Sequence, residues 1–198
     1  MAGDISIPEF RVKYNDVFSL RNLYLMMHEM LLEEGWRGKE GDADHSDIET
    51  LYSENVYQKG IHRGGKEIWF WWRAEKFPEG KYSQYFKNSL DIDAHIVYLQ
   101  NVEIVQQGKK LNAQKGEIEI FFRAKMLLDY QHKWEKGFLK MMKPIYERKI
   151  MHHEIEKREK ELWRDVYRIQ GKIKQYLELR TFVPVPEPFF ARRYGFEE

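Results

Sequence analysis

The residues best suited to metal chemistry fall in two short stretches. The first is the acidic, glycine-containing segment 37–49, whose candidate ligands are Asp42, Asp44, His45, Asp47 and Glu49. Hard cations such as Ca²⁺ take oxygen ligands of this kind, but a calcium loop also needs glycine at its sixth position and glutamate at its twelfth. The spacing in this segment fails that pattern, so we expect a solvated acidic loop and assign no metal ligand.

The second stretch contains His152, His153 and Glu156. On a helix, His152 and Glu156 would lie four residues apart on one face, a spacing that zinc and iron sites use. Such sites need further ligands, and the chain has no His-Glu-x-x-His motif. Adjacent histidines of this kind are more typical of a solvated helix surface, and we predict no metal.

The sequence contains no motif for a catalytic nucleophile or for a cofactor-binding site. The chain contains no cysteine, which excludes disulfides, a thiolate nucleophile and a Cys-ligated metal site. It also has no Gly-x-Ser-x-Gly elbow, Walker loop or Rossmann glycine pattern. We therefore predict no catalytic residue and no cofactor, and the lack of cysteine favours a reducing, cytoplasmic setting.

Residues 1–8 lack the basic and apolar runs of a signal peptide, and no apolar stretch approaches the roughly 18 residues that span a bilayer. With 198 residues, 42% hydrophobic and 33% charged, the chain is long enough for one globular domain with a real core. The net charge of +1 is unevenly distributed. Residues 1–60 hold 6 Lys/Arg and 12 Asp/Glu (−6), whereas residues 133–180 hold 14 and 8 (+6). Ends of opposite charge favour internal docking or association between chains, but they also suit two solvated faces.

An aromatic and charged strand face is the strongest candidate contact surface. Residues 67–75 alternate, so that Trp69, Trp71 and Arg73 share the face opposite Ile68, Phe70 and Trp72. Phe121 and Arg123 occupy matching positions on residues 117–130, and Asp91, Asp93 and His95 on residues 90–100. Aromatic rings interleaved with arginine could cover a protein partner or stack on nucleic-acid bases. Alternatively, the long helix covers this face and the charges pair across strands.

The order of predicted elements is strand, helix, several antiparallel strands and a long helix. Ser19 is a plausible N-cap and Gly35 a C-cap for a helix over 20–34. The Asn15-Asp16 pair predicts a turn after a strand over 10–14, and Gly64-Gly65 predicts a hairpin. The remaining expected elements are strands over 49–59, 67–77, 90–100 and 117–130, a small hairpin around Gly108, and a helix from 138 to 179.

The C-terminal third supplies two candidate association surfaces. Five apolar residues recur at 4-3-4-3 spacing, which is the seam of a coiled coil or helix pair: Leu162, Val166, Ile169, Ile173 and Tyr176. Prolines at 184, 186 and 188 predict an extended, stiff tail. Its rings, which we expect to dock on protein, are Phe182, Phe189, Phe190, Tyr194 and Phe196.

We therefore predict an α+β fold in which a curved antiparallel sheet with an N-terminal helix spans 1–136. The long helix over 137–180 would pack on the sheet or extend from it, and 181–198 would form the tail. This order resembles the helix-grip arrangement of START-like proteins. Three stretches (49–52, 66–76 and 115–136) also resemble an uncharacterised family of small archaeal proteins, a resemblance that implies an archaeal source and no chemistry.

Three functions are compatible with these features. The first is a non-catalytic binding or assembly protein that acts through protein–protein contacts and self-associates as a homo-oligomer. The second is an RNA-binding or ribosome-associated factor that uses the basic helix and the face around Trp71. The third, which follows from the helix-grip order, is a carrier of an apolar small ligand in a cavity between sheet and helix.

Overall fold

The computed structural model describes residues 4–38, 48–80, 82–106, 109–134 and 137–178. It is an α+β fold with a six-stranded antiparallel sheet that does not close into a barrel. The strands are β1 (Ile5–Ser6), β2 (Phe10–Phe18), β3 (Glu49–Val56), β4 (Lys66–Lys76), β5 (Phe86–Gln106) and β6 (Lys109–Leu128). The helices are α1 (Leu20–Glu33), α2 (Gly137–Ile145), a π-helical segment over Tyr146–Ile150, α3 (His152–Tyr176), and a short 3₁₀ turn over Ser83–Tyr85.

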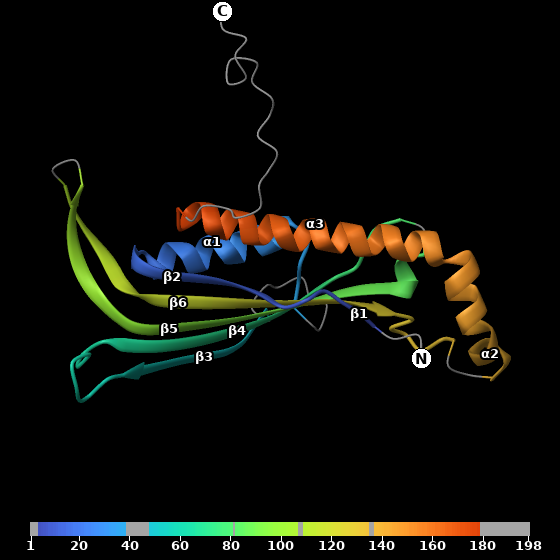
Figure 1. Ribbon diagram of the computed structural model, residues 1–198, viewed down its shortest axis with the longest axis horizontal. Helices are drawn as coiled ribbons and strands as arrows, with labels where there is room; N and C mark the ends of the chain where they lie inside the picture. The colour runs from blue at the N-terminus through green and yellow to red at the C-terminus, as the bar shows by residue number, and fades with distance from the viewer. Residues whose placement is uncertain (1–3, 39–47, 81, 107–108, 135–136, 179–198) are drawn as a thin grey trace, which may run out of the picture.

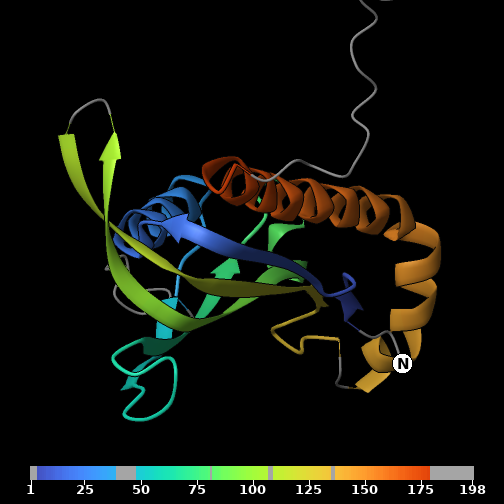
Figure 2. The same cartoon turned by 60° about the vertical axis from the view of Figure 1, so that its left-hand side comes forward.

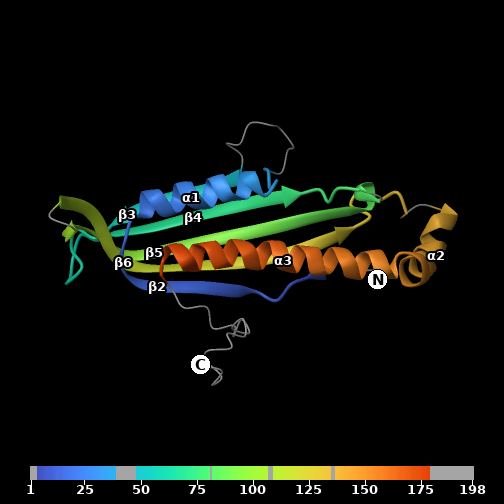
Figure 3. The ribbon, with the colours of Figure 1, turned by 90° about the horizontal axis from the view of Figure 1, so that it is seen from above.

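The strand order is β1-β6-β5-β4-β3, and β2 pairs with the outer edge of β6 beside β1. Both long helices lie on one face of this curved sheet, α1 over the β4 side and α3 over the β6 side (Figures 1 and 3). Figure 2 shows that the helices leave the opposite face of the sheet uncovered. The predicted curved sheet with an N-terminal helix and a long C-terminal helix is confirmed.

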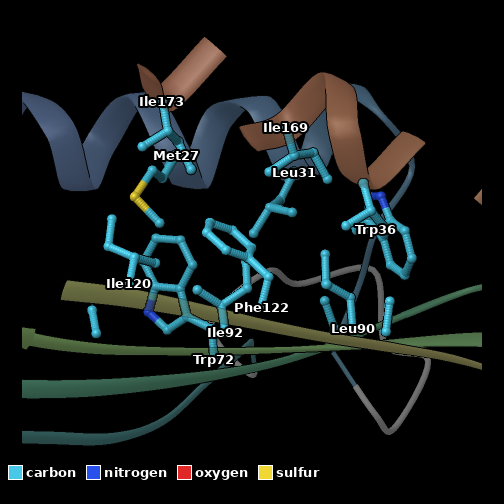
Figure 4. Packing of buried hydrophobic residues seen from close by; sticks show 14 of the residues in the cluster. Met27, Leu31, Trp36, Trp72, Leu90, Ile92, Ile120, Phe122, Ile169 and Ile173 are labelled. Atoms are coloured by element: carbon cyan, nitrogen blue, oxygen red, sulfur yellow. The ribbon is translucent and has the colours of Figure 1, made fainter. Parts of the chain in front are cut away.

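The core fills the space between the helices and the sheet. Figure 4 shows Ile169 and Ile173 of α3 and Met27 and Leu31 of α1 pointing toward Phe122 and its neighbours on the strands. Trp36 and Trp72 are also fully buried there. Because large apolar side chains are worth roughly 1.5–3 kcal/mol each when fully buried, this layer is the main source of stability.

Local signals define α1 as expected. The Oγ of Ser19 accepts a hydrogen bond from the backbone N–H of Asn22 (3.4 Å), and Gly35 adopts the left-handed conformation (φ +81°) just after the helix. These are the N-cap and C-terminal signals of a single amphipathic helix, whose buried face includes Leu23 and Met27.

Two local expectations are wrong, and a third is confirmed as part of a larger element. Asn15 and Asp16 lie inside β2, because pairing with Glu117 and Gly116 of β6 overrides their turn preference. The small hairpin expected around Gly108 is present, since Val102 pairs with Ala113 and Ile104 with Leu111, but it is the far end of one long hairpin formed by β5 and β6. The helix expected over 138–179 is interrupted between Ile145 and His152, just after Pro144, which lacks a backbone donor and disfavours a straight helix.

Candidate functional site

The uncovered sheet face brings together the five residues predicted as a partner or RNA surface. On the central strand β5, Asp93 lies between Trp71 of β4 and Phe121 of β6. Two residues away on β5, Asp91 lies between Arg73 of β4 and Arg123 of β6. The alternation of side chains along the strands thus places these rings and arginines on the same face of the sheet, as predicted. The alternative is wrong in placing the long helix over this face, because α3 packs on the opposite, apolar face. Its second part, in which the charges pair across strands, is confirmed.

The charges of this face are nevertheless paired with one another. Arg73 Nη1 lies 2.6 Å from Asp93 Oδ1, and Arg123 contacts the other oxygen of the same carboxylate. Lys13 pairs with Glu117 at 2.5 Å, and Arg11 with Glu119 at 3.3 Å. These cross-strand pairs resemble those of an ordinary solvated sheet face, and they leave few free cations for phosphate groups.

The aromatic rings of the face are also engaged. Trp69 stacks on His95 with ring centroids 3.5 Å apart, and His95 Nε2 lies 2.9 Å from Glu67. Trp71 is 38% exposed, with the Arg73 guanidinium 5.8 Å from its ring centroid. This surface could contact a partner through Trp71. Its arginines Arg73 and Arg123 are paired with Asp93 and its Trp69 ring is stacked on His95, so these groups do not favour single-stranded nucleic acid.

The predicted oligomer seam belongs to the chain's own core. Leu162, Val166, Ile169 and Ile173 are at most 1% exposed, and the Tyr176 hydroxyl donates a hydrogen bond to the carbonyl of Ser19 (3.1 Å). The 4-3-4-3 spacing therefore describes a helix packed on its own sheet and on α1. Our interpretation of these five residues as a surface between copies is corrected, since they are already covered within one chain.

The described residues of the two stretches considered for metal binding do not form an assembled ligand set. His152 Nε2 lies 3.3 Å from Glu156 Oε1 on the exposed surface of α3. The described ranges contain no group of three or more His, Asp or Glu residues arranged to hold a metal. Asp42, Asp44, His45 and Asp47 lie outside the described residues, as does the tail with Phe182, Phe189, Phe190, Tyr194 and Phe196. Docking of that tail stays a prediction.

Sequence reasoning missed a pocket beside α1. A hollow of about 450 Å³ opens between α1, the edge strand β3, its neighbour β4 and the bend of the β5–β6 hairpin. Its apolar lining comes from Leu20 and Leu25 of α1, Ile68 and Phe70 of β4, and Leu99 of β5. Its volume lies in the range of small-molecule sites, which are mostly apolar with a few polar groups.

A β-bulge shapes this pocket. The pairing of β5 with β6 shifts between Val97 and Gln100, opposite Gly116, and Tyr98 takes φ +57°. The extra residue reverses the alternation, so Leu99 turns inward to line the pocket, while Tyr98 is 42% exposed. Simple alternation from Leu90 through Ile96 would place Tyr98 on the core face instead, which the structure contradicts. Gly116, a glycine inside a strand pattern, was the available signal for a bulge.

Polar groups lie around the rim of the pocket. Lys66 and Glu54 form an ion pair at 2.6 Å, and the Tyr24 hydroxyl donates a 2.5 Å hydrogen bond to Glu49. Burial, and then the hydrogen bond to Glu49, raises the pKa of Tyr24 above its ordinary value of 10, so its phenol keeps its proton further into the alkaline range than a free tyrosine does. Arg21 of α1 has no carboxylate partner within the described part of the chain. The first turn of α1, where Arg21 lies, contains no acidic residue, so both the side chain and the helix dipole are positive there.

A second hollow, of about 670 Å³, lies between the C-terminal end of α1 and α3. Charged side chains line it, and they pair among themselves: Lys76 with Asp165 (2.6 Å) and Arg158 with Glu161 (3.0 Å). It has no apolar floor comparable to that of the pocket beside α1. The pocket beside α1 is therefore the better candidate for a small-molecule site.

Comparisons with known proteins assign no family to this chain: no family model, no curated protein and no solved structure matches it. The resemblances to the archaeal family and to helix-grip proteins therefore stay expectations. None of the helices in the described ranges combines the length and the apolar character required to span a bilayer.

Proposed function

We propose that this chain binds a small amphipathic molecule, with an apolar body and an acidic end group, in the pocket between α1 and the sheet. The observation that supports the proposal is the combination of an apolar floor with Arg21 at the rim, which has no carboxylate partner among the described residues. Of the three functions that the sequence allows, this is closest to the carrier of an apolar ligand. The proposed site, however, lies beside α1 and not beneath the long helix α3.

The space beneath α3 does not suit a ligand, because packed side chains occupy it. Phe122, Leu90 and Ile92 are fully buried against the helices. Beside α1 the packing is incomplete: Leu25 is 46% exposed and Tyr52 50% exposed at the mouth of the pocket. An apolar ligand would cover these two exposed surfaces and rest on Ile68 and Leu99, which are already buried. Removal of the exposed apolar area from water is the main source of affinity.

Arg21 specifies the end group. An arginine without a carboxylate partner, at the positive end of a helix dipole, favours an anion such as a carboxylate. Lys66 also lines the pocket, but Glu54 already neutralises it. An acidic end group is therefore expected to lie toward Leu20 and Arg21, with the apolar body extending toward Phe70 and Leu99.

The other two functions have less structural support. Self-association was motivated by the seam that includes Ile169, and those residues are buried within the chain. RNA binding was motivated in part by Arg73 and Arg123, which pair with Asp93. On α3, Arg168 and Lys172 both approach Glu34. Both functions stay predictions.

Isothermal titration of the full chain with dodecanoate and with 1-dodecanol, below micellar concentrations, tests the proposal. Dodecanoate is expected to bind more tightly than the alcohol. Arg21→Gln should weaken dodecanoate binding by about tenfold, the value of a partly exposed charged hydrogen bond, with little effect on the alcohol. Leu25→Glu should weaken both ligands, because it places a carboxylate at the mouth of the pocket.

Two matched variants serve as controls. Arg164→Gln removes an arginine from the exposed surface of α3, and Ile61→Glu introduces a carboxylate in the exposed loop between β3 and β4. Neither residue lines the pocket. If neither ligand binds, or if Arg21→Gln behaves as Arg164→Gln does, the proposal is wrong.

A further inference from the structure

The helix α2 is amphipathic, yet its apolar face is exposed. Phe138 is 70% exposed, Met141 69% and Ile145 52%, and they recur at the i, i+3, i+7 spacing of one helical face. Leu139 and Ile150 add further exposed apolar surface, and no residue of α2 is buried. In a monomeric protein such a face normally packs inward, so this one is available for contact with something outside the chain. We refer to residues 137–150 as the arm.

The orientation of the arm is set by specific contacts on its polar side. Lys143 Nζ lies 3.2 Å from Asp129, whose carboxylate also accepts hydrogen bonds from the backbone N–H groups of Lys133 and Trp134. Glu147 is buried and accepts a 2.5 Å hydrogen bond from Tyr85. Lys143 and Glu147 thus face the body of the protein, whereas the large apolar side chains of the arm are exposed.

Stacked rings reinforce this anchor. Tyr146 lies against Trp134 with centroids 4.3 Å apart, and Tyr85 meets both rings edge-on. Met151, at the junction with α3, is 1% exposed. The base of the arm is therefore packed, so its apolar face cannot turn inward without breaking the Tyr85–Glu147 and Lys143–Asp129 contacts.

The exposed charges of the arm all have one sign. They are Lys140, Arg148 and Lys149. Glu147, the one acidic residue between Gly137 and Ile150, is directed to Tyr85. The outer surface of the arm therefore combines large apolar side chains with positive charge. These two properties together suit a surface whose outer layer is negatively charged and whose interior is apolar.

We propose that the arm lies on an anionic lipid surface, with Phe138, Met141 and Ile145 inserted among the acyl chains and the basic side chains at the headgroups. Figures 1 and 3 show α2 projecting at one end of the molecule, beyond the sheet and at an angle to α3. A projecting helix can enter a planar interface without a shape-matched groove, and anionic headgroups complement its charges. The inference does not depend on a ligand in the pocket beside α1.

Co-sedimentation of the full chain with vesicles tests this inference. The vesicles are phosphatidylcholine alone, or a 7:3 mixture of phosphatidylcholine and phosphatidylglycerol. We expect binding to the anionic vesicles that weakens as salt is raised, because exposed charges are screened. Phe138→Glu/Met141→Glu should lower the partition coefficient by about tenfold or more, since two inserted apolar side chains are replaced by carboxylates.

Val56→Glu/Ile61→Glu is the matched control. It replaces two exposed apolar residues (54% and 93% exposed) and changes the net charge equally, but far from the arm in the fold. It should retain more binding than the arm variant. A second pair separates charge from apolar insertion: Lys140→Gln/Lys149→Gln should weaken binding more than Lys157→Gln/Lys160→Gln on the exposed surface of α3.

Three results would overturn the inference. One is no sedimentation with anionic vesicles at low salt. Another is equal loss of binding in the arm variant and its matched control. The third is a stable dimer in light scattering that the arm variant dissociates and anionic vesicles do not, which would assign the arm to a second copy of the chain.

Discussion

The phenol of Tyr85 donates a 2.5 Å hydrogen bond to the carboxylate of Glu147 in the interior of the protein. The two residues are 62 positions apart, one just before β5 and the other in the π-helical segment between α2 and α3. Their contact joins the sheet to the arm. It also satisfies a buried carboxylate, which would otherwise destabilise the fold.

Replacement of Tyr85 by Phe should lower the free energy of unfolding by about 1–3 kcal/mol, because it leaves the Glu147 carboxylate buried without its donor. The measurement is urea denaturation at neutral pH. Tyr82→Phe is the control, since Tyr82 is 48% exposed. Equal stability of the two variants would show that the hydrogen bond contributes nothing.

Stability should fall in the alkaline range. Burial, and then the hydrogen bond to Glu147, raises the pKa of Tyr85 above its ordinary value of 10. Below pH 10 the phenol is neutral in both folded and unfolded states, and its contribution is fully present. As the pH rises above 10, the unfolded state loses its proton first, so the free energy of unfolding decreases.

Urea denaturation between pH 9 and 11.5 measures this dependence. Tyr85→Phe should show a shallower decline than the unmodified chain, because one titrating phenol has been removed. Other groups that ionise in this range in the unfolded state, such as Tyr24, are common to both proteins and cancel in the comparison. A decline of the same slope in both would contradict the prediction.

The bulge opposite Gly116 should not tolerate a side chain. A Cβ at this position would lie 3.0 Å from the carbonyl oxygen of Val97 and 3.1 Å from the Cα of Leu99, and backbone atoms cannot move aside easily. We expect Gly116→Ala to lower the free energy of unfolding by about 1–3 kcal/mol. It should also weaken dodecanoate binding, because Leu99 lines the pocket.

Gly171→Ala is the matched substitution. A Cβ at Gly171 in α3 meets nothing within 4 Å, so alanine should stabilise the helix by up to about 1 kcal/mol. Thermal denaturation of both variants is sufficient for the comparison. The account of the bulge fails if Gly116→Ala is as stable as Gly171→Ala.

Ile169→Glu should destabilise the folded chain and not merely separate copies. Ile169 is fully buried, and a carboxylate in its place has no cationic partner, which costs at least about 3 kcal/mol. Gln175→Glu, at an exposed position of the same helix, should be close to neutral. Circular dichroism and light scattering distinguish the two cases. A variant with unchanged stability but a smaller mass in solution would support the interpretation of these residues as an interface between copies.

The order of elements and the main core faces could be predicted from sequence because they depend on local signals. Ser19 and Gly35 delimit α1, and alternation identifies the buried side of β4 with Phe70 and Trp72. The spacing from Leu162 to Ile173 was recognised correctly as an apolar helical face, but the pattern is the same whether the helix packs on its own sheet or on another chain.

The pocket and the arm could not be predicted from periodicity, because each depends on a break in a regular element. The pocket requires the bulge at Tyr98, where one extra residue reverses which side chains face α1. The arm requires a break in the helix near Pro144 and the distant contact between Tyr85 and Glu147. Both arise from residues far apart in the chain, so periodicity alone predicted one long helix and a regular strand.

The central claim is that the pocket beside α1 holds an amphipathic acid. The most direct measurement is a titration of the ¹⁵N-labelled full chain with dodecanoate, followed by amide chemical shifts. We predict saturable shifts concentrated at Arg21, Leu25, Leu99 and Asn101, with little change at Trp71 on the uncovered sheet face. Shifts confined to the sheet face or to the arm, or no saturable shift at all, would contradict the claim.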